Sequence, residues 1–146
     1  MLIFFNIKNM IIFASLIIIN RIMAEHNELG KNGENFAVEF LEGKGYQIIT
    51  RNWRCGSNEL DIVALDGDTL VFVEVKTRYS DYIDPRTSMS KSKIRNFVNA
   101  VTMYLRKMQV NSNFRLDVII IVMQSGFDNK GMYVEHYEDA ILPTDF

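Results

Sequence analysis

The stretch that decides the fold is Leu70–Tyr79, LVFVEVKTRY, which joins an apolar strand pattern to two charged residues. Its four successive apolar residues at the start predict a buried strand. Glu74 and Lys76 follow two positions apart, and because strand side chains alternate between faces, both charges project from the same side. The other side is apolar, with Val71, Val73 and Val75. We therefore expect a core strand that carries an acid and a base on one face.

The preceding segment predicts the neighbour of this strand. Glu59–Leu65, ELDIVAL, has strand character, and the Asp66-Gly67 turn joins it to the next strand as a hairpin. Alternation places Asp61 on one face with Glu59 and Val63, and it places Leu60, Ile62 and Ala64 on the other face.

If the polar faces of the two strands coincide, Asp61 and Glu74 lie within several ångströms of each other, with Lys76 beside them. Opposed like charges destabilise a sheet, and one lysine only partly offsets the acids. A divalent cation would resolve the conflict, because Mg²⁺ suits one or two carboxylates together with water and phosphate oxygens.

Glu34 adds a further carboxylate from outside the hairpin. Apolar spacing predicts a helix over Gly33–Gly43, with Asn32 as its N-cap. Glu34 lies at the margin of the buried stripe of this helix, where a carboxylate needs a partner. A metal site at the sheet would be one such partner.

The remaining segments complete an α/β plan. A strand is expected over residues 46–55 and a loop over residues 79–90, followed by a second helix. The apolar face of that helix comprises Ile94, Phe97, Val98, Val101, Leu105 and Met108. A strand over residues 114–123 is apolar enough for burial on both faces, and residues 131–142 supply an edge strand. The predicted fold class is α/β, an αβββαβ core whose mixed sheet is flanked by helices.

Composition sets the class of protein and its compartment. With 146 residues and 48% hydrophobic content, the chain suits one globular domain. A lone cysteine, Cys55, excludes an internal disulfide framework and fits a reducing compartment, so we expect a cytoplasmic protein. His26 and His136 have no metal-binding spacing, and a structural or solvent-exposed role is expected for both.

Charge divides the chain into a basic middle and an acidic end. Residues 51–115 hold eleven Lys and Arg against seven acids, whereas residues 116–146 hold one lysine against six acids. Such an asymmetry can mark a nucleic-acid face, although a soluble domain can also show it.

Residues 1–22 form an apolar N-terminal extension that is set apart from a single domain over residues 23–146. The longest clean apolar run, Met10–Ile19, is about half the length needed to span a bilayer. Arg21 and Ile22 stand where small residues would precede a signal cleavage site. The preferred interpretation is translation from Met23, with an N-terminal membrane anchor as the alternative.

Asp61, followed by Glu74 and Lys76 in an ExK motif and preceded by a helical Glu34, resembles the PD-(D/E)xK nuclease signature. The stretches GENFAVEFLEGKGYQIITRNWR, ELDIVA, LVFVEVKTR and FRLDVI together resemble the YraN-like family of uncharacterised bacterial proteins, uncharacterised protein family 0102. That family is grouped with archaeal Holliday-junction resolvases in the restriction-endonuclease-like superfamily. The resemblance runs from about Leu29 to the C-terminal region.

The resemblance implies a role for each matching residue. Asp61 and Glu74 would ligate Mg²⁺ or Mn²⁺, and Glu34 would bind the ion directly or through water. Lys76 would orient or help deprotonate the attacking water and would stabilise charge on the phosphate. Glu59 would be an accessory acid. Leu60 stands in place of the signature proline and Asn58 in place of a frequent glycine, and neither departure removes a chemical group.

Nucleic-acid contacts are expected from a set of basic residues, namely Arg51, Arg54, Arg78, Lys91 and Lys93. Of these, Arg51 or Arg78 would clamp a phosphate with a bidentate guanidinium. Trp53 and Tyr79 could stack on bases or pack in the core. Asp117 is expected to form an ion pair with Arg115 at the end of its strand.

Three hypotheses for function follow. The first is a Mg²⁺-dependent endonuclease that acts on structured or branched DNA, working by analogy with resolvases as a homodimer. The second is a nucleic-acid-binding module that keeps the fold without turnover and serves DNA processing as a partner. The third takes residues 1–22 as a membrane anchor on an otherwise unrelated domain.

Overall fold

The computed structural model describes residues 31–79, 89–123 and 132–141, with Tyr79 and Met132 described by their backbone alone. The chain divides into two units, Met1–Asn32 and Gly33–Phe146, and nearly all described residues belong to the second unit. The predictions made for residues 1–22, for His26 and for most of the loop after residue 79 lie outside the described residues.

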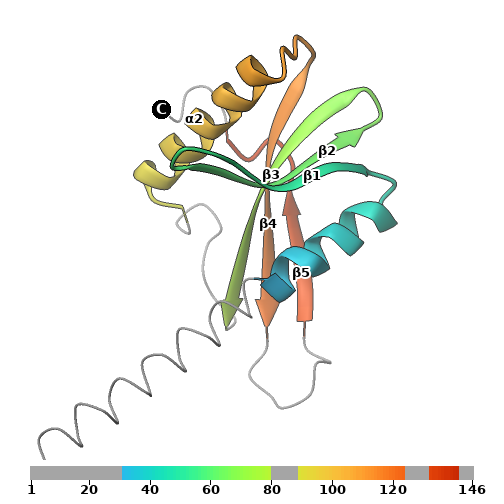
Figure 1. Ribbon diagram of the computed structural model, residues 1–146. Helices are drawn as coiled ribbons and strands as arrows, with labels where there is room; N and C mark the ends of the chain where they lie inside the picture. Colours follow the sequence, from blue (N-terminus) through green and yellow to red (C-terminus); the bar gives the residue numbers. More distant parts are fainter. Residues whose placement is uncertain (1–30, 80–88, 124–131, 142–146) are drawn as a thin grey trace, which may run out of the picture. The chain divides into compact units, whose positions relative to one another are not determined.

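The second unit is built on a mixed sheet. Its strands are β1 (Gln47–Cys55), β2 (Asn58–Asp66), β3 (Thr69–Tyr79), β4 (Phe114–Met123) and β5 (Met132–Tyr137). They lie in the order β1-β2-β3-β4-β5 (Figure 1), with β3 and β4 parallel and the other neighbouring pairs antiparallel. Helix α2 (Lys91–Lys107) connects the parallel strands, and another helix covers residues 31–43. The predicted α/β fold is confirmed, and it is consistent with a restriction-endonuclease-like core.

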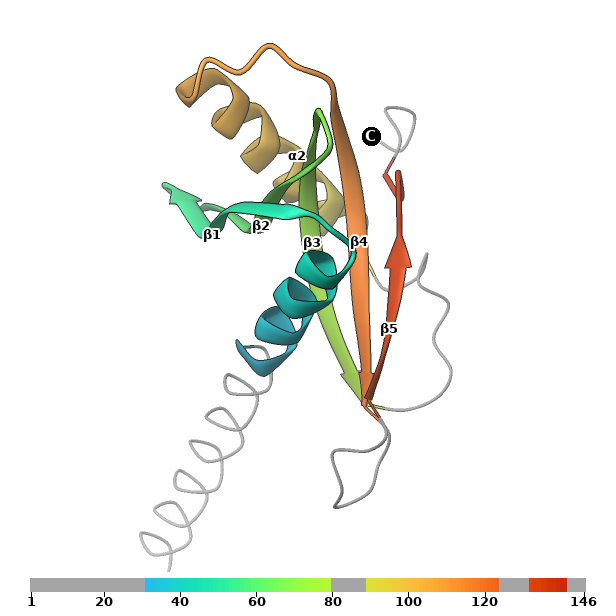
Figure 2. The same ribbon diagram turned by 90° about the vertical axis from the view of Figure 1, so that its right-hand side faces the viewer.

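Each face of the sheet has its own helix and its own apolar cluster (Figures 1 and 2). Phe97, Ala100, Val101 and Tyr104 of α2 pack on one face, against Phe72 of β3. On the other face the helix over residues 31–43 contributes Ala37 and Leu41, which join Val71, Val73 and Ile119. Strand β4 is buried from Leu116 to Val122, as its unbroken apolar run predicts.

The helix over residues 31–43 lies against β3 at its first turn. A Cβ atom at Gly33 would overlap the hydroxyl of Thr77, so only glycine allows this approach. The helix ends at Gly43 as expected, and Gly45 then adopts a positive φ of 91° while the Tyr46 amide donates to the Leu41 carbonyl. The prediction of Asn32 as N-cap is wrong, because Asn32 lies within the helix. Its capping propensity is a local signal that the helix overrides.

The side chains of β2 do not alternate strictly between the two faces of the sheet. Its pairing with β3 runs from Ile62 opposite Val73 to Asp66 opposite Thr69. Beyond that register Leu60 packs in the cluster under α2, whereas Ile62 and Ala64 pack on the opposite face. The prediction that these three share a face is therefore wrong for Leu60. The register with β3 ends at Ile62, whereas pairing with β1 continues through Leu60 opposite Trp53 to Asn58 opposite Cys55.

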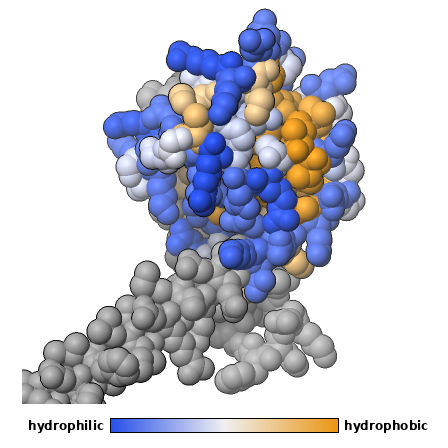
Figure 3. All heavy atoms as spheres, in the orientation of Figure 1, coloured by the Kyte–Doolittle hydropathy of each residue, from blue (hydrophilic) through white to orange (hydrophobic). Residues whose placement is uncertain are grey.

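The surface of the second unit is mixed. On the face shown in Figure 3, hydrophilic side chains surround a hydrophobic patch. Large apolar side chains that remain exposed among the described residues are Ile49, Met103, Met108, Phe114 and Tyr133. No helix among the described residues has both the length and the apolar character required to cross a bilayer.

Candidate functional site

A cavity of about 210 Å³ lies where the β1–β2 turn, β2, β3 and α2 meet. Five predicted site residues line it, namely Glu59, Asp61, Glu74, Lys76 and Lys93. The other lining residues are Ser57, Asn58, Asn96 and Phe97. The structure thus places the acids of β2 and the ExK motif of β3 around one space, as the hairpin predicts.

Asp61 is held by the backbone of the neighbouring strand. Its Oδ2 accepts a hydrogen bond of 2.8 Å from the Val75 N–H. Burial and the charge of Glu74 raise the pKa of Asp61 to about 7, although the Val75 hydrogen bond and Lys76 oppose the rise. Glu34 raises this pKa further. An ionised Asp61 is therefore electrostatically costly, and a cation beside it would relieve that cost.

Glu74 and Lys76 form an ion pair within the cavity wall, between Oε1 and Nζ. Each side chain is only 16% exposed. Both project from the same face of β3, as their spacing predicts. The charge of Lys76 is therefore paired mainly with Glu74, and Lys76 offsets the charge of Asp61 less directly.

Glu34 does not line the cavity, although its charge acts on Asp61. Within residues 31–79, 89–123 and 132–141, no set of three or more His, Cys, Asp or Glu side chains is arranged to hold a metal ion. Asp61 and Glu74 are the carboxylates that would be expected to ligate a divalent cation there, because Mg²⁺ is commonly bound by one or two carboxylates together with water and phosphate oxygens.

The predicted phosphate-binding residues divide into two groups. Lys91 and Lys93 are exposed in the first turn of α2, and only Lys93 reaches the cavity. Among the arginines, Arg54 pairs with Glu59 at 2.8 Å, Arg51 donates to Asn35 at 2.5 Å, and Arg78 is half-buried on β3.

Four cavity residues were not predicted as site residues, namely Ser57, Asn58, Asn96 and Phe97, and Phe97 was expected only in the apolar core. Ser57 and Asn58 lie at the β1–β2 turn, where polar residues ordinarily serve only the turn. Asn96 could have been found, because it is three residues after Lys93 and so lies on the same side of α2.

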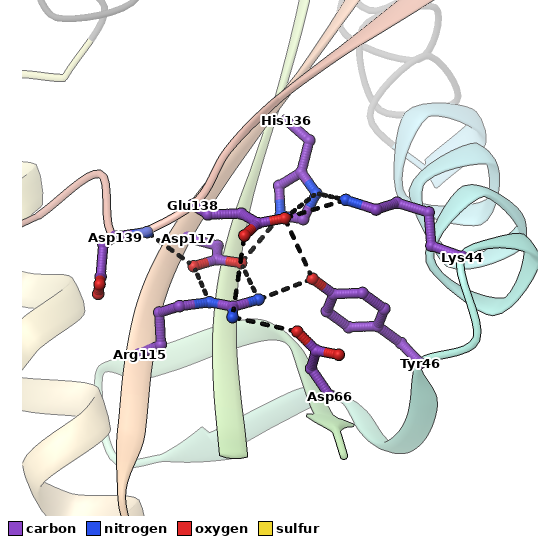
Figure 4. Close-up of polar contacts among 8 residues, drawn as sticks. All are labelled: Lys44, Tyr46, Asp66, Arg115, Asp117, His136, Glu138 and Asp139. Carbon is purple, nitrogen blue, oxygen red and sulfur yellow. Dashed lines mark hydrogen bonds and ion pairs between the residues drawn. The ribbon is translucent and has the colours of Figure 1, made fainter. Parts of the chain in front are cut away.

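A second polar cluster, drawn in Figure 4, is made of residues that do not line the cavity. Asp117, with 0% exposure, accepts from Arg115 at 2.9 and 3.1 Å and pairs with His136 at 2.8 Å. Although burial opposes it, hydrogen bonds from His136 and Arg115 lower the pKa of Asp117. Arg115 also donates to Asp66 and to the Tyr46 hydroxyl. The predicted Arg115–Asp117 ion pair is confirmed, and the cluster ties β2, β4 and β5 together.

Packing narrows the alternatives that the sequence left open for Trp53. Trp53 makes an edge-to-face contact with Tyr104, at 5.2 Å between ring centroids, and joins the cluster under α2. This favours core packing over base stacking. The Tyr79 side chain lies outside what the structure describes. Cys55 is a free, half-buried thiol.

The fold and the site define a mixed α/β protein, consistent with a restriction-endonuclease-like core, in which a carboxylate pair and a lysine share a cavity beneath α2. A family profile described as "Uncharacterised protein family UPF0102" matches residues 33–121. The chain is 42% identical to the UPF0102 protein of Bacteroides thetaiotaomicron over 125 residues, which cover 85% of this chain and 100% of the relative. It is 42% identical to the Flavobacterium psychrophilum protein over 119 residues, covering 81% and 97% respectively. The UPF0102 protein of Geotalea uraniireducens is 40% identical over 119 residues, covering 80% and 91%. The chain belongs to the UPF0102 family, which is uncharacterised.

Proposed function

We propose that this protein is a Mg²⁺-dependent endonuclease that hydrolyses phosphodiester bonds in structured or branched DNA. The observation that supports it most is the cavity in which Asp61, Glu74 and Lys76 meet. A carboxylate pair beside a lysine is the set of groups that metal-assisted phosphodiester hydrolysis requires. The resemblance of these residues to the PD-(D/E)xK signature supports the same reaction.

Asp61 and Glu74 would hold the ion, which when bound supplies an activated water and neutralises charge on the phosphate. The Val75 N–H holds the Asp61 carboxylate in place through Oδ2, which would orient this carboxylate toward an ion. Lys76 is paired with Glu74, and it would act as a hydrogen-bond donor that orients water and a phosphate oxygen. Glu34 adds negative charge near Asp61 and would act through water.

A second candidate is a nucleic-acid-binding module without turnover. It is favoured by the position of Lys93 on the cavity wall and of Arg54 beside the wall residue Glu59. In this case the basic residues around the cavity, including Arg54 and Lys93, would supply phosphate contacts whose affinity falls with salt.

The experiment that separates these candidates is a cleavage panel with labelled four-way junctions, flaps and single strands, each with Mg²⁺, Mn²⁺ or EDTA. The variants are Asp61→Ala and Glu74→Ala, and the matched control is Asp68→Ala, an exposed carboxylate in the β2–β3 turn. Metal-dependent cutting that is lost in the first two variants and kept in the control supports the endonuclease. Binding of DNA without cutting, unchanged by loss of the acids, supports the binding module.

We also propose that the protein acts on DNA in the cytoplasm as a homodimer, since a junction has two strands to cut symmetrically. Sedimentation velocity tests the oligomeric state with and without a four-way junction. A chain that remains monomeric in both conditions contradicts the dimer.

A further inference from the structure

The α2 wall of the cavity faces the carboxylates from the other side. Lys93 and Asn96 are one helical turn apart, so both side chains lie on the side of α2 that borders the cavity. The opposite wall carries Asp61 and Glu74 on β2 and β3. An anion in this space therefore contacts a basic and an amide side chain on one side and carboxylates on the other.

The ion pairs around the cavity distinguish its two lysines. Lys76 is paired with Glu74, and Glu59 is paired with Arg54. Within the part of the chain that the structure describes, the Lys93 ammonium forms no ion pair. Lys93 is thus the cavity lysine whose charge remains available for an incoming anion.

The end of the helix reinforces this positive charge. Ser90 caps α2 by accepting from the Lys93 N–H at 3.3 Å, and the first turn contains no acidic residue. The N-terminal end of a helix carries a partial positive charge that an acidic first turn would cancel. Here nothing in the first turn cancels it, and the end of the 17-residue helix borders the cavity.

We propose that Lys93 and Asn96 form the phosphate-binding wall of the site and hold the phosphodiester group against the carboxylate wall. Lys93 supplies a point charge to a non-bridging oxygen, and the Asn96 amide donates a hydrogen bond to a second oxygen. Lys76 remains on the side of the carboxylates. The inference rests on the proposed function and deepens it by naming the residues that bind the substrate.

The test measures binding separately from cleavage. The fluorescence anisotropy of a labelled four-way DNA junction is titrated with the full chain, without metal and with Ca²⁺, over a series of KCl concentrations. The variants are Lys93→Ala, Lys93→Arg and Asn96→Ala. The control is Lys107→Ala, which removes the same charge from the same helix about 21 Å along its axis.

Lys93→Ala is expected to weaken binding about tenfold at low salt and to reduce the slope of log K against log salt by about 0.9. Lys93→Arg keeps the charge and should retain most of the affinity. Asn96→Ala is expected to weaken binding about threefold with no change in slope, because it removes a neutral donor. Lys107→Ala should change neither quantity.

Equal affinities and slopes for Lys93→Ala and Lys107→Ala would overturn the inference, and so would a wild-type chain that leaves the junction unbound in both conditions. Failure of the proposed function is a different result, in which the junction binds and is not cut with Mg²⁺ or Mn²⁺. Thermal unfolding of each variant confirms that any loss of binding is not a loss of fold.

Discussion

The substitution Asp61→Asn gives the sharpest test of the electrostatics of the cavity. Burial and Glu74 raise the pKa of Asp61 from its ordinary 3.8 to about 7. A rise of this kind favours the protonated form in the folded protein, so the wild type loses stability as pH increases from about 4 to about 7. At 1.36 kcal/mol for each pH unit, the loss has an upper limit of about 4 kcal/mol. Because Asp61 is only half-buried, we expect about 2 kcal/mol.

Asparagine removes the charge and keeps an oxygen that can accept from the Val75 N–H. The variant should therefore be more stable than wild type by about 2 kcal/mol above pH 7, and this advantage should shrink towards zero as pH falls to 4. The assay is urea unfolding at steps between pH 4 and 8.5, with Asp68→Asn as the exposed control. A stability difference that is the same at every pH, or that favours wild type at high pH, refutes the reasoning.

Three further predictions concern other parts of the molecule. Asp117→Asn should lower the free energy of unfolding by about 3 kcal/mol in urea titrations, because it leaves the Arg115 guanidinium partly buried without its main partner. Gly33→Ala should lower the melting temperature, with a cost of about 1–3 kcal/mol, and Thr77→Ala in the same chain should restore most of it, because the overlap is with the Thr77 hydroxyl. Lys76→Met should slow cleavage about a hundredfold in single-turnover assays. Because it removes no metal ligand, the Mg²⁺ concentration that raises the melting temperature of the protein half-maximally should change by less than about threefold.

Much of the fold follows from local patterns that the structure preserves. The Asp66-Gly67 turn fixes the β2–β3 hairpin, and Gly67 adopts the positive φ of 58° that such a turn requires. The alternation of Val71 and Val73 with Phe72 and Glu74 sorts β3 between the two faces of the sheet. Residue spacing alone was enough in these segments because each depends on neighbours close in sequence.

Other features depend on contacts between distant segments, which a single sequence does not reveal. The displacement of Leu60 to the α2 face arises where β2 stops pairing with β3, and no local pattern marks that position. The Asp117 cluster joins His136 of β5 and Tyr46, just before β1, to Arg115 and Asp117 of β4. Spacing suggested the Arg115 pair alone, because Arg115 and Asp117 are two residues apart.

The candidate site likewise combines residues that local patterns predict with residues that only the folded structure brings together. Asp61, Glu74 and Lys76 could be grouped from strand alternation and one hairpin. Asn96 and Lys93 reach the same cavity only because α2 crosses over the sheet between β3 and β4. Glu34 was expected as a third carboxylate, and its helix does bring its charge near Asp61, but it does not reach the cavity wall.

The central claim is that Asp61 and Glu74 serve a metal-dependent cut in DNA. Its most direct test is the single-turnover cleavage rate of a labelled four-way junction, measured against Mg²⁺ concentration for wild type, Asp61→Asn and Asp68→Asn. The account predicts a rate for wild type and Asp68→Asn that rises with Mg²⁺ and saturates, and a rate at least about a hundredfold lower for Asp61→Asn. Cutting that persists in EDTA, or that proceeds equally fast in Asp61→Asn, would contradict it.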